Sequence, residues 1–476
     1  MKWRTIGLVL GLTLLMCIPA LSADYVVQVG PPDLSGDDTA VLQAALDDCM
    51  TNHPTGCTVQ LSAGTYKSQQ LFGESFHGSL KGMGMDATRI QVKRFDEVTG
   101  DHIGYYIFDI YPPSRTNKYP VLLIFMAGDI TVSDMSFVVT DYEPVPQWCY
   151  YDECGQTWLY GVVGVIGTSA DLLVERVGFE GGPGTMVASR HNYNDGPFFW
   201  GLSGDQPLTG TFKVVSSRIR NSEDSLTAIA LSNAKITIGG SPSHGNVIEG
   251  GSQGAGFLDM AHSVVDFSYN DVEVSAYPWA GVLAGQGYAW IPQESSQFLI
   301  RHNTIKATGG YVDGVWAIDF GPPLGLGKTA DFVISDNTVQ IAGSEVDPAW
   351  AGIEAAYLEG AVISNNRIVG GSALGIALEG ASQCMVKANN AEKLTADLAP
   401  IGLLTVNIGT EEEPILLPTS DSTVVGFGNK TNVYADPEGY GNILVGVNNM
   451  QGNPPGPAIR DAMKRKMEMI KSMRKF

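Results

Sequence analysis

One phrase recurs through the second half of the chain, in which a short apolar segment and a polar pair lead to an asparagine. The step from one asparagine to the next is 33, 34, 29 and 23 residues. The repeated asparagines are Asn270, Asn303, Asn337, Asn366 and Asn389. A second phrase, with alternating apolar residues, starts upstream of each at Gly256, Gly281, Gly314, Gly352 and Gly375. A unit this short cannot bury its own apolar face, so successive units must stack on one another.

The asparagines decide between a solenoid and a propeller. An asparagine between two strands tolerates a left-handed backbone and bonds its own turn, and identical asparagines in stacked coils form a ladder. A propeller would need frequent tight hairpins with Asn-Gly or Asp-Gly, and these are sparse in the chain. The sequence therefore predicts an all-β parallel β-helix of roughly ten coils over residues 73–453, with loops of variable length at one turn.

The two ends of the chain differ from the repeats. Residues 1–23 have the layout of a secretory signal, with Lys2 and Arg4, an apolar run and small residues before Asp24, so we expect a secreted or periplasmic protein. Residues 454–476 are basic and suit a helix or tail. No later stretch is apolar enough to span a bilayer, and we expect a monomer.

The charge of the chain restricts its partners. The formal net charge is −21, which excludes the basic surface that nucleic acids require. Cysteines in an exported chain favour disulfides, and Cys49 with Cys57 and Cys149 with Cys154 are close enough in sequence to pair. Cys384 occupies an apolar position of the repeat, so we expect a buried free thiol. No ligand spacing indicates zinc.

Residues 24–72 predict an amino-terminal cap and a first coil. Gly36-Asp-Asp-Thr39 precedes an amphipathic helical pattern, and a Cys49–Cys57 bond would pin that helix over the open end of the array. The segments GDDTAVLQAALDDC, TVQLSAGTY and SLKGMGMDATRI resemble the opening of pectate-lyase-superfamily proteins of the polygalacturonase and rhamnogalacturonase-like branch. The resemblance implies a right-handed parallel β-helix with an amino-terminal capping helix. These segments are structural, so they imply no particular activity.

The range 218–238 is similar to the polygalacturonase segment in which two adjacent aspartates precede a strand. Glu223 and Asp224 occupy the places of those aspartates. The family's Asn-Thr-Asp, Gly-His-Gly and Arg-x-Lys elements are missing from the neighbouring coils, so polygalacturonase activity is not expected. The two residues are therefore candidate catalytic carboxylates, with a solvated acidic turn as the alternative.

Three other carboxylates are further candidates. Asp313 has the place of Asp224 three coils on, about 14 Å away at about 4.8 Å per coil, which is too far for a glycosidase pair. Asp259 is expected one coil from Asp224, pointing inward as a bonded core carboxylate or as one with a raised pKa. Asp319 either faces the same groove or caps a turn.

Aromatic residues gather in the segments between the predicted strands. Between Glu223 and Gln297 the only basic residue is Lys235, against eight acidic ones. A groove lined by these aromatic and acidic residues would suit a neutral glycan, or an acidic glycan bridged by calcium between carboxylates. The aromatic rings either stack on sugars or pack the loops against the helix. The candidate substrate-binding residues are Trp200, Trp279, Tyr288, Trp290 and Trp316.

These features predict a carbohydrate-active protein with a polysaccharide or oligosaccharide as its partner. A glycoside hydrolase would use Asp224 with a second carboxylate. A polysaccharide lyase would instead need a Lys, Arg or Tyr base beside a neutralised uronate. A β-helix that binds a glycan or a cell surface without catalysis is the third hypothesis.

Overall fold

The computed structural model describes residues 25–33, 36–92, 121–139, 145–150, 153–157, 161–181, 197–201, 208–275, 280–286, 295–309, 312–325, 327–343, 349–408, 415–426 and 432–449. The expected signal segment 1–23 and the basic segment 454–476 lie outside these ranges. None of the described helices has the length and hydropathy needed to cross a membrane.

Nearly all regular structure in the described chain is β-strand. In chain order the elements are β1 (Tyr25–Val29), α2 (Thr39–Asn52), β2 (Cys57–Leu61), β3 (Gly64–Ser68), β4 (Leu71–Ser75), β5 (Gly78–Lys81), β6 (Thr88–Val92), β7 (Val121–Val139), β8 (Val145–Tyr150), β9 (Glu153–Thr157), β10 (Gly161–Gly181), β11 (Pro197–Gly201), β12 (Leu208–Val215), β13 (Arg218–Asp224), β14 (Thr227–Gly239), β15 (Val247–Ala261), β16 (Val264–Ser268), β17 (Asp271–Val274), β18 (Ala280–Gln286), β19 (Ser296–Arg301), β20 (Thr304–Thr308), β21 (Asp313–Asp319), the 3-10 helix η2 (Pro322–Leu324), β22 (Ala330–Ser335), β23 (Thr338–Ala342), β24 (Ala351–Ala356), β25 (Val362–Ser364), β26 (Arg367–Glu379), β27 (Met385–Lys387), β28 (Asn390–Leu404), β29 (Val406–Asn407), β30 (Leu416–Leu417), β31 (Thr423–Val425), β32 (Asn432–Ala435), β33 (Ile443–Val445) and β34 (Asn448–Asn449).

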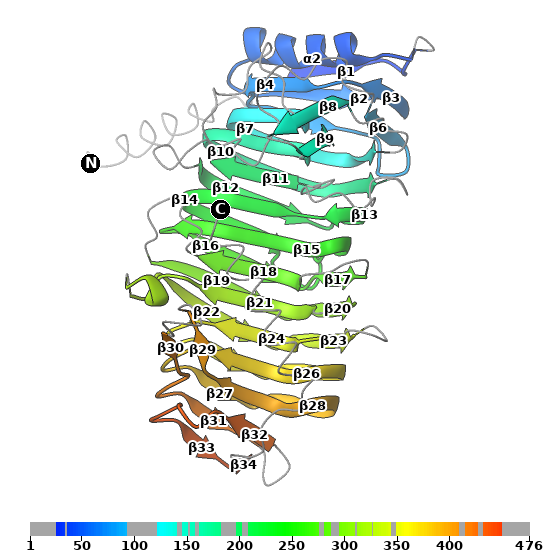
Figure 1. Cartoon of the computed structure of the whole chain (residues 1–476). Coiled ribbons are helices and arrows are strands. Elements are labelled where there is room, and N and C mark those ends of the chain that lie inside the picture. The colour runs from blue at the N-terminus through cyan, green and yellow to red at the C-terminus, as the bar shows by residue number, and fades with distance from the viewer. Residues whose placement is uncertain are drawn as a thin grey trace, which may run out of the picture.

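The strands stack as the rungs of one column, with α2 across the end that carries the first strands (Figure 1). Each strand of the column pairs in parallel with its equivalent in the next coil, and these pairs form three stacks, whereas β8–β9 and β29–β30 are separate antiparallel pairs. The first stack is β1, β2, β5, β7, β10, β12, β14, β16, β19, β22, β25, β27, β31 and β33. The second is β3, β6, β7, β10, β13, β15, β17, β20, β23, β26 and β28. The third is β4, β7, β10, β11, β14, β15, β18, β21, β24, β26, β28, β32 and β34.

The predicted parallel β-helix is therefore confirmed. Long strands such as β7 and β10 belong to more than one stack because they continue round a corner of the coil. The first stack has more strands than the roughly ten coils expected, because the coils nearest the amino terminus lack the asparagine phrase on which that count depended.

The asparagine ladder is present and begins one coil earlier than the sequence indicated. Asn246 Nδ2 donates to Asn270 Oδ1 at 2.9 Å, and Asn270 Nδ2 donates to Asn303 Oδ1 at 3.1 Å. The ladder continues through Asn337, Asn366 and Asn389 with separations of 2.9–3.0 Å. The left-handed backbone was expected at the asparagine itself, but it belongs to the residue before it, as at His302 with φ 56°. The side chain of the asparagine bonds the neighbouring coils instead: Asn303 Oδ1 accepts the backbone N–H of Asn270, and Asn303 Nδ2 donates to the carbonyl of Phe267 and to Asn337 Oδ1.

A row of glycines lines one corner of the coil. A Cβ atom on Gly314 would lie 2.3 Å from Cγ1 of Val339 and 2.5 Å from the carbonyl oxygen of Gly352. The sequence phrase placed Gly256 in this row, but Gly256 pairs with Leu283, and Gly254 is the residue that approaches Gly281. The row exists because only glycine leaves room for the backbone of the next coil. It consists of Gly254, Gly281, Gly314, Gly352 and Gly375.

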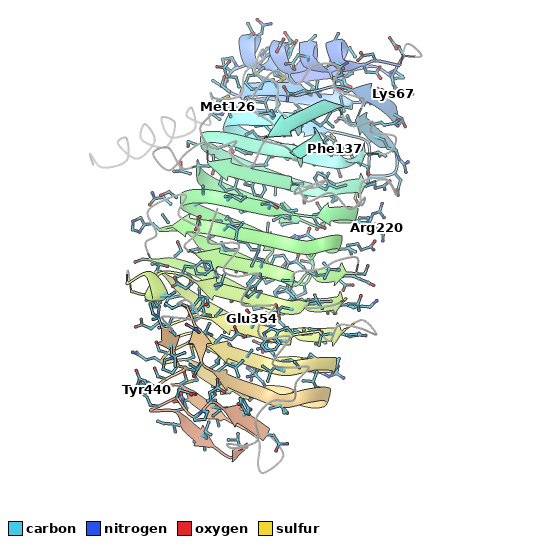
Figure 2. The ribbon with its side chains drawn as sticks, in the orientation of Figure 1. Lys67, Met126, Phe137, Arg220, Glu354 and Tyr440 are labelled. Atoms are coloured by element: carbon cyan, nitrogen blue, oxygen red, sulfur yellow. A yellow bond between two sulfur atoms is a disulfide. The ribbon has the colours of Figure 1, made fainter. Side chains whose placement is uncertain are left out.

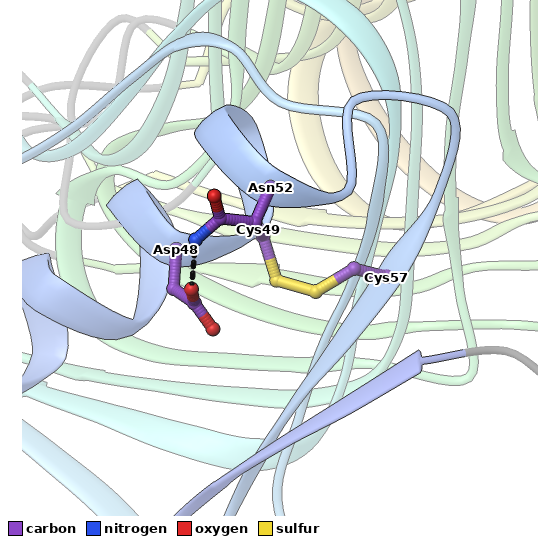
Figure 3. The surroundings of a disulfide bond; sticks show 4 residues. All are labelled: Asp48, Cys49, Asn52 and Cys57. Carbon is purple, nitrogen blue, oxygen red and sulfur yellow. Dashed lines mark hydrogen bonds between the residues drawn. A yellow bond between two sulfur atoms is a disulfide. The ribbon is translucent and has the colours of Figure 1, made fainter.

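The amino-terminal cap agrees with the sequence. α2 buries Leu42, Ala45, Leu46 and Cys49 against the first coils, and the disulfide joins Cys49 to Cys57 at the start of β2 (Figure 3). The carboxylate of Asp38, which directly precedes α2, makes no bond to that helix and accepts the backbone N–H of Lys67 at 2.8 Å instead. The start of the helix is thereby fixed to β3.

The other cysteines are placed as follows. Cys384 is a buried free thiol, as expected, and burial raises its pKa to about 11. Cys149 and Cys154 lie opposite each other in the antiparallel β8–β9 pair. Their side chains lie outside the described part, so their pairing stays a prediction.

Candidate functional site

The outer side of the third stack carries an unusual set of side chains. In β21, Val315 and Ala317 point into the main core, whereas Trp316 and Ile318 belong to a separate buried cluster on the opposite side of the strand. This alternation assigns the equivalents of Trp316 and Ile318 in the neighbouring coils to the same outer side. The row of Asp313 joins them at the corner of the coil, because its members pack in the same two outer clusters, which contain Ala280, Ala351, Leu374 and Ala399.

Three rows of positions make up this outer side, which we call the carboxylate face. The first row is Asp224, Gln253, Ala280, Asp313, Ala351, Leu374 and Ala399. The second row is Thr227, Gly256, Leu283, Trp316, Glu354, Ala377 and Gly402. The third row is Ile229, Leu258, Gly285, Ile318, Ala356, Glu379 and Leu404.

Asp224 and Asp313 share the first row, three coils apart, as the repeat predicted. At about 4.8 Å per coil, their backbones are about 14 Å apart, so the two do not form an acid/base pair. Asp313 is fully buried, and its Oδ1 accepts the backbone N–H of Ala351 at 3.0 Å. The side chains of Glu223 and Asp224 lie outside the described part, so their catalytic role stays a prediction.

Asp259 does not lie beside Asp224. The partner of Asp224 in the next coil is Gln253, six residues before Asp259. Asp259 instead follows Leu258, which pairs with Ile229, and it has a left-handed backbone with φ 52°. It is fully buried, as expected. The expected proximity to Asp224 was therefore wrong, because six residues of β15 separate Asp259 from the partner of Asp224.

The aromatic residues proposed to bind substrate are only partly visible. Trp316 is fully buried among Leu283, Ile318 and Phe320, so in this structure its ring is a packing element with no face open to a sugar. Of the two alternatives, packing describes Trp316 in this structure, and its role in binding substrate stays a prediction. Trp200 is described in its backbone alone, and Trp279, Tyr288 and Trp290 lie outside the described residues.

Sequence reasoning missed two carboxylates on the carboxylate face. Glu354 on β24 lies next to Trp316 in the second row, among the yellow strands in Figure 2. Glu379 at the end of β26 lies one coil further and two residues along, because Ala377 is the partner of Glu354. Their Cα atoms are therefore about 8 Å apart, from about 4.8 Å between strands and about 3.3 Å per residue.

Both glutamates are covered, with exposed fractions of 0% for Glu354 and 5% for Glu379. The indole N–H of Trp350 donates to Oε1 of Glu379 at 2.9 Å. Glu354 could have been found in the sequence because a charged residue stands there at a position that is apolar in the neighbouring coils. Its equivalents in those coils are Trp316 and Ala377.

Asp319 has the turn-capping role that the sequence left open. Its carboxylate accepts the backbone N–H groups of Gly321, Thr329 and Ala330 at 2.9, 3.0 and 3.2 Å, and the hydroxyl of Thr329 at 2.5 Å. Burial raises the pKa of Asp319, and the bonds from Thr329 oppose that shift. Asp319 therefore fixes the loop between β21 and β22.

The described residues contain no group of three or more His, Cys, Asp or Glu side chains arranged to hold a metal ion. The carboxylates of the face are spread over several coils and all three of its rows, which is not the compact oxygen cage that calcium prefers. Calcium therefore stays a prediction from the acidic composition.

No protein-family model and no curated protein sequence matches the chain. Solved structures do. The A-module of mannuronan C-5 epimerase AlgE6 from Azotobacter vinelandii is 12% identical over 88% of this chain and 93% of its own, with a TM-score of 0.36. A hyperthermoactive exopolygalacturonase from Thermotoga maritima is 10% identical over 89% and 92%, with a TM-score of 0.35. The Agl-KA catalytic domain is 14% identical over 90% and 68%, with a TM-score of 0.45. These likenesses concern the fold alone, and the parallel registers of this chain establish its parallel β-helix independently.

Proposed function

We propose that this chain is a secreted or periplasmic carbohydrate-active protein, a monomeric glycoside hydrolase that cleaves a polysaccharide or oligosaccharide at the carboxylate face. The observation that carries the proposal is the pair Glu354 and Glu379, one coil apart on the same side of the sheet. Their Cα atoms are about 8 Å apart, and we propose that the two carboxyl groups take the separation of about 6.5–9.5 Å that holds a water molecule and a glycosidic bond between them.

The surroundings of the two glutamates suggest different roles. Glu379 accepts a hydrogen bond from the indole of Trp350, and we assign it as the general base. Glu354 is the register partner of the apolar residue Trp316 in the adjacent coil, and we assign it as the general acid. In hydrolysis, Glu379 takes a proton from water as the oxygen attacks the anomeric carbon. Glu354 gives its proton to the glycosidic oxygen as the bond from that oxygen to the anomeric carbon breaks.

Burial supports a functional reading of these groups. A carboxylate removed from water costs several kcal/mol of folding free energy unless bonds compensate for it. Asp313, Glu354 and Glu379 are all buried on successive strands of one face, whereas Glu249 and Glu273 on the second stack lie in exposed ion pairs. Both glutamates are covered in this structure, so the proposed reaction requires that the face become accessible to a glycan.

A lyase is less well supported. Lysis needs a base together with a cation that neutralises the uronate, and the described rows contain no Lys, Arg, His or Tyr. The full burial of Trp316 and Glu354 instead favours a non-catalytic β-helix as the second candidate, in which the buried carboxylates brace the coil.

The test compares three glutamine variants on a panel of polysaccharides, with release of reducing ends as the readout. Glu354→Gln and Glu379→Gln are each expected to lower turnover about 100- to 10,000-fold, the usual contribution of a general acid or base. Glu273→Gln, an exposed glutamate paired with Lys306 on the second stack, is the matched control and should retain full activity. Unchanged turnover in the first two variants, with unchanged folding, would remove the pair from catalysis.

A further inference from the structure

We infer that residues 457–476 form an amphipathic helix that binds along an apolar patch on the outer side of the first stack. The patch lies on the last described coils, where β27, β31 and β33 follow one another at the end of the column opposite α2 (Figure 1). It belongs to a different stack from the carboxylate face, so the inference does not depend on the proposed function.

The apolar patch is made of aliphatic side chains that face outward from three consecutive strands. In each of β27, β31 and β33 the middle residue is the most buried, and the residues on either side of it point away from the column. The exposed fractions are 39% for Met385, 38% for Val425, 57% for Ile443 and 49% for Val445. These four residues form the patch.

The row of Met385 continues the patch along the column. Its register partners in the preceding coils are the half-buried residues Val362, Val333 and Leu299. In the three coils before β19 the same row is polar and contains Asp266, Thr237 and Lys213. Single aliphatic side chains on a surface need no partner, whereas a contiguous apolar row over several coils indicates a contact surface.

The chain itself contains a segment with the matching pattern. Residues 457–476 carry apolar residues at steps of four, four, three and three, namely Ile459, Met463, Met467, Ile470 and Met473. Such steps put side chains on one side of an α-helix. One helical turn advances about 5.4 Å, and one coil of the column advances about 4.8 Å. A helix laid along the row therefore brings about one of these residues to each coil.

The lengths of the helix and of the row also agree. From Leu299 to Ile443 the row crosses five coil steps, about 24 Å, and Ile459 to Met473 covers about 21 Å of helix. The described residues end at Asn449, in the same coil as β33. The connection from there to residue 457 can extend over about 26 Å. The helix can therefore start at β33 and run back along the row.

The charges around the patch favour a basic partner. Residues 295–303, 327–337, 357–365, 380–389, 415–426 and 436–447 contain the first-stack strands from β19 to β33 and the segments beside them. Their cations are Arg301, Lys328 and Lys387, and their carboxylates are Asp331, Asp336, Glu359, Asp421, Asp436 and Glu438. Of these cations only Lys387 belongs to β27, β31 or β33. Residues 457–476 have seven basic and two acidic side chains, so the two surfaces attract each other.

Disulfide trapping in the full chain tests the contact. Met385→Cys is combined with Met467→Cys, which lies near the level of β27 when Ile459 is opposite β33, in a Cys384→Ser background that removes the buried free thiol. Lys213→Cys with Met467→Cys is the matched control, because Lys213 is exposed in the same row six coils away. Under mild oxidation with oxidised glutathione, we expect the first pair to form an intramolecular disulfide at least about tenfold more than the control.

The other outcomes of the trapping contradict the inference. No bond in either pair means that the segment is free or lies on another surface, such as an anionic membrane. Equal trapping of the two pairs means that the segment has no fixed place on the column. A disulfide between two chains means that a second copy supplies the segment.

Hydrogen exchange gives a second measurement without new cysteines. The amide groups of residues 459–473 should be protected in the wild type. They should exchange at least about tenfold faster when Met385→Gln and Ile443→Gln are combined, because the apolar contact is lost. Lys213→Gln is the control and should leave the protection unchanged. Unprotected amides in the wild type, or the same protection in the double variant, would overturn the inference.

Discussion

Glu354 and Glu379 lie on adjacent coils of the same face, two residues out of register, with a hydrogen bond from Trp350 to Glu379. Their Cα atoms are about 8 Å apart, and our assignment gives the two carboxyl groups the separation of an inverting glycosidase, with room for a water molecule on one side of the sugar. The assignment of these two residues as acid and base therefore also predicts the stereochemistry of the reaction.

We expect hydrolysis to invert the anomeric configuration. Proton NMR of the first product, recorded before mutarotation, should show the anomer opposite to that of the substrate linkage. Retention of configuration would contradict the assignment, because a retaining pair requires carboxyl groups only about 5–5.5 Å apart.

Asn303→Ala should destabilise the central coils by about 2–4 kcal/mol. The change removes the donor to the carbonyl of Phe267 and to Asn337 Oδ1, and it leaves two buried donors of Asn270 without their acceptor. Thr304→Ala is the exposed control in the next position and should change the free energy of unfolding by less than about 0.5 kcal/mol. Denaturant unfolding followed by circular dichroism measures both, and equal stability of the two variants would refute the role of the ladder.

Gly314→Ala should destabilise the protein by about 1–3 kcal/mol through overpacking. The added methyl group would lie 2.5 Å from the carbonyl oxygen of Gly352, and a backbone atom cannot move aside without shifting a coil. Gly30→Ala, where the new atom has no neighbour within 4 Å, is the matched control. A wild-type melting temperature for Gly314→Ala would show that the coils are less closely packed than described.

The thiol of Cys384 makes stability depend on alkaline pH. Burial raises its pKa from an ordinary value of 9.0 to about 11, so the folded state binds its proton more tightly than the unfolded state does. Its contribution, about 2–3 kcal/mol, is fully present below pH 9 and is lost as the pH rises through 11. Unfolding of wild type and Cys384→Ala between pH 8 and 11 measures this, and parallel curves for the two proteins would contradict it.

Most of the fold was predictable from the sequence because each coil repeats the same local requirements. Asn303 and Asn337 appear in one phrase because each bonds the next coil, and Gly314 and Gly352 recur because the backbones approach closely. The first coils were harder to recognise, since their corners use other residues, such as Ser217, whose backbone N–H bonds Asn246. The sequence predicted the left-handed backbone at the ladder asparagine, whereas the structure has it at the preceding residue. The two positions could not be distinguished because both lie in the same tight turn.

The candidate site was predictable only in part. The common row of Asp224 and Asp313 follows from the repeat, because both precede equivalent strands. The closeness of Glu354 and Glu379 depends on the step from β24 to β26, which is set by loop lengths that the repeat does not fix. Whether Trp316 is buried or exposed could not be decided from the sequence. Side-chain alternation assigns it to the outer side of the strand but does not say which residues cover that side.

The most direct test of the account is a crystal structure of the Glu354→Gln variant with an oligosaccharide from the polymer that the wild type cuts. We expect a glycosidic oxygen within hydrogen-bond distance of the glutamine side chain at position 354, with a water molecule between the sugar and Glu379. A sugar bound over the first or second stack, or more than about 10 Å from both glutamates, would contradict it.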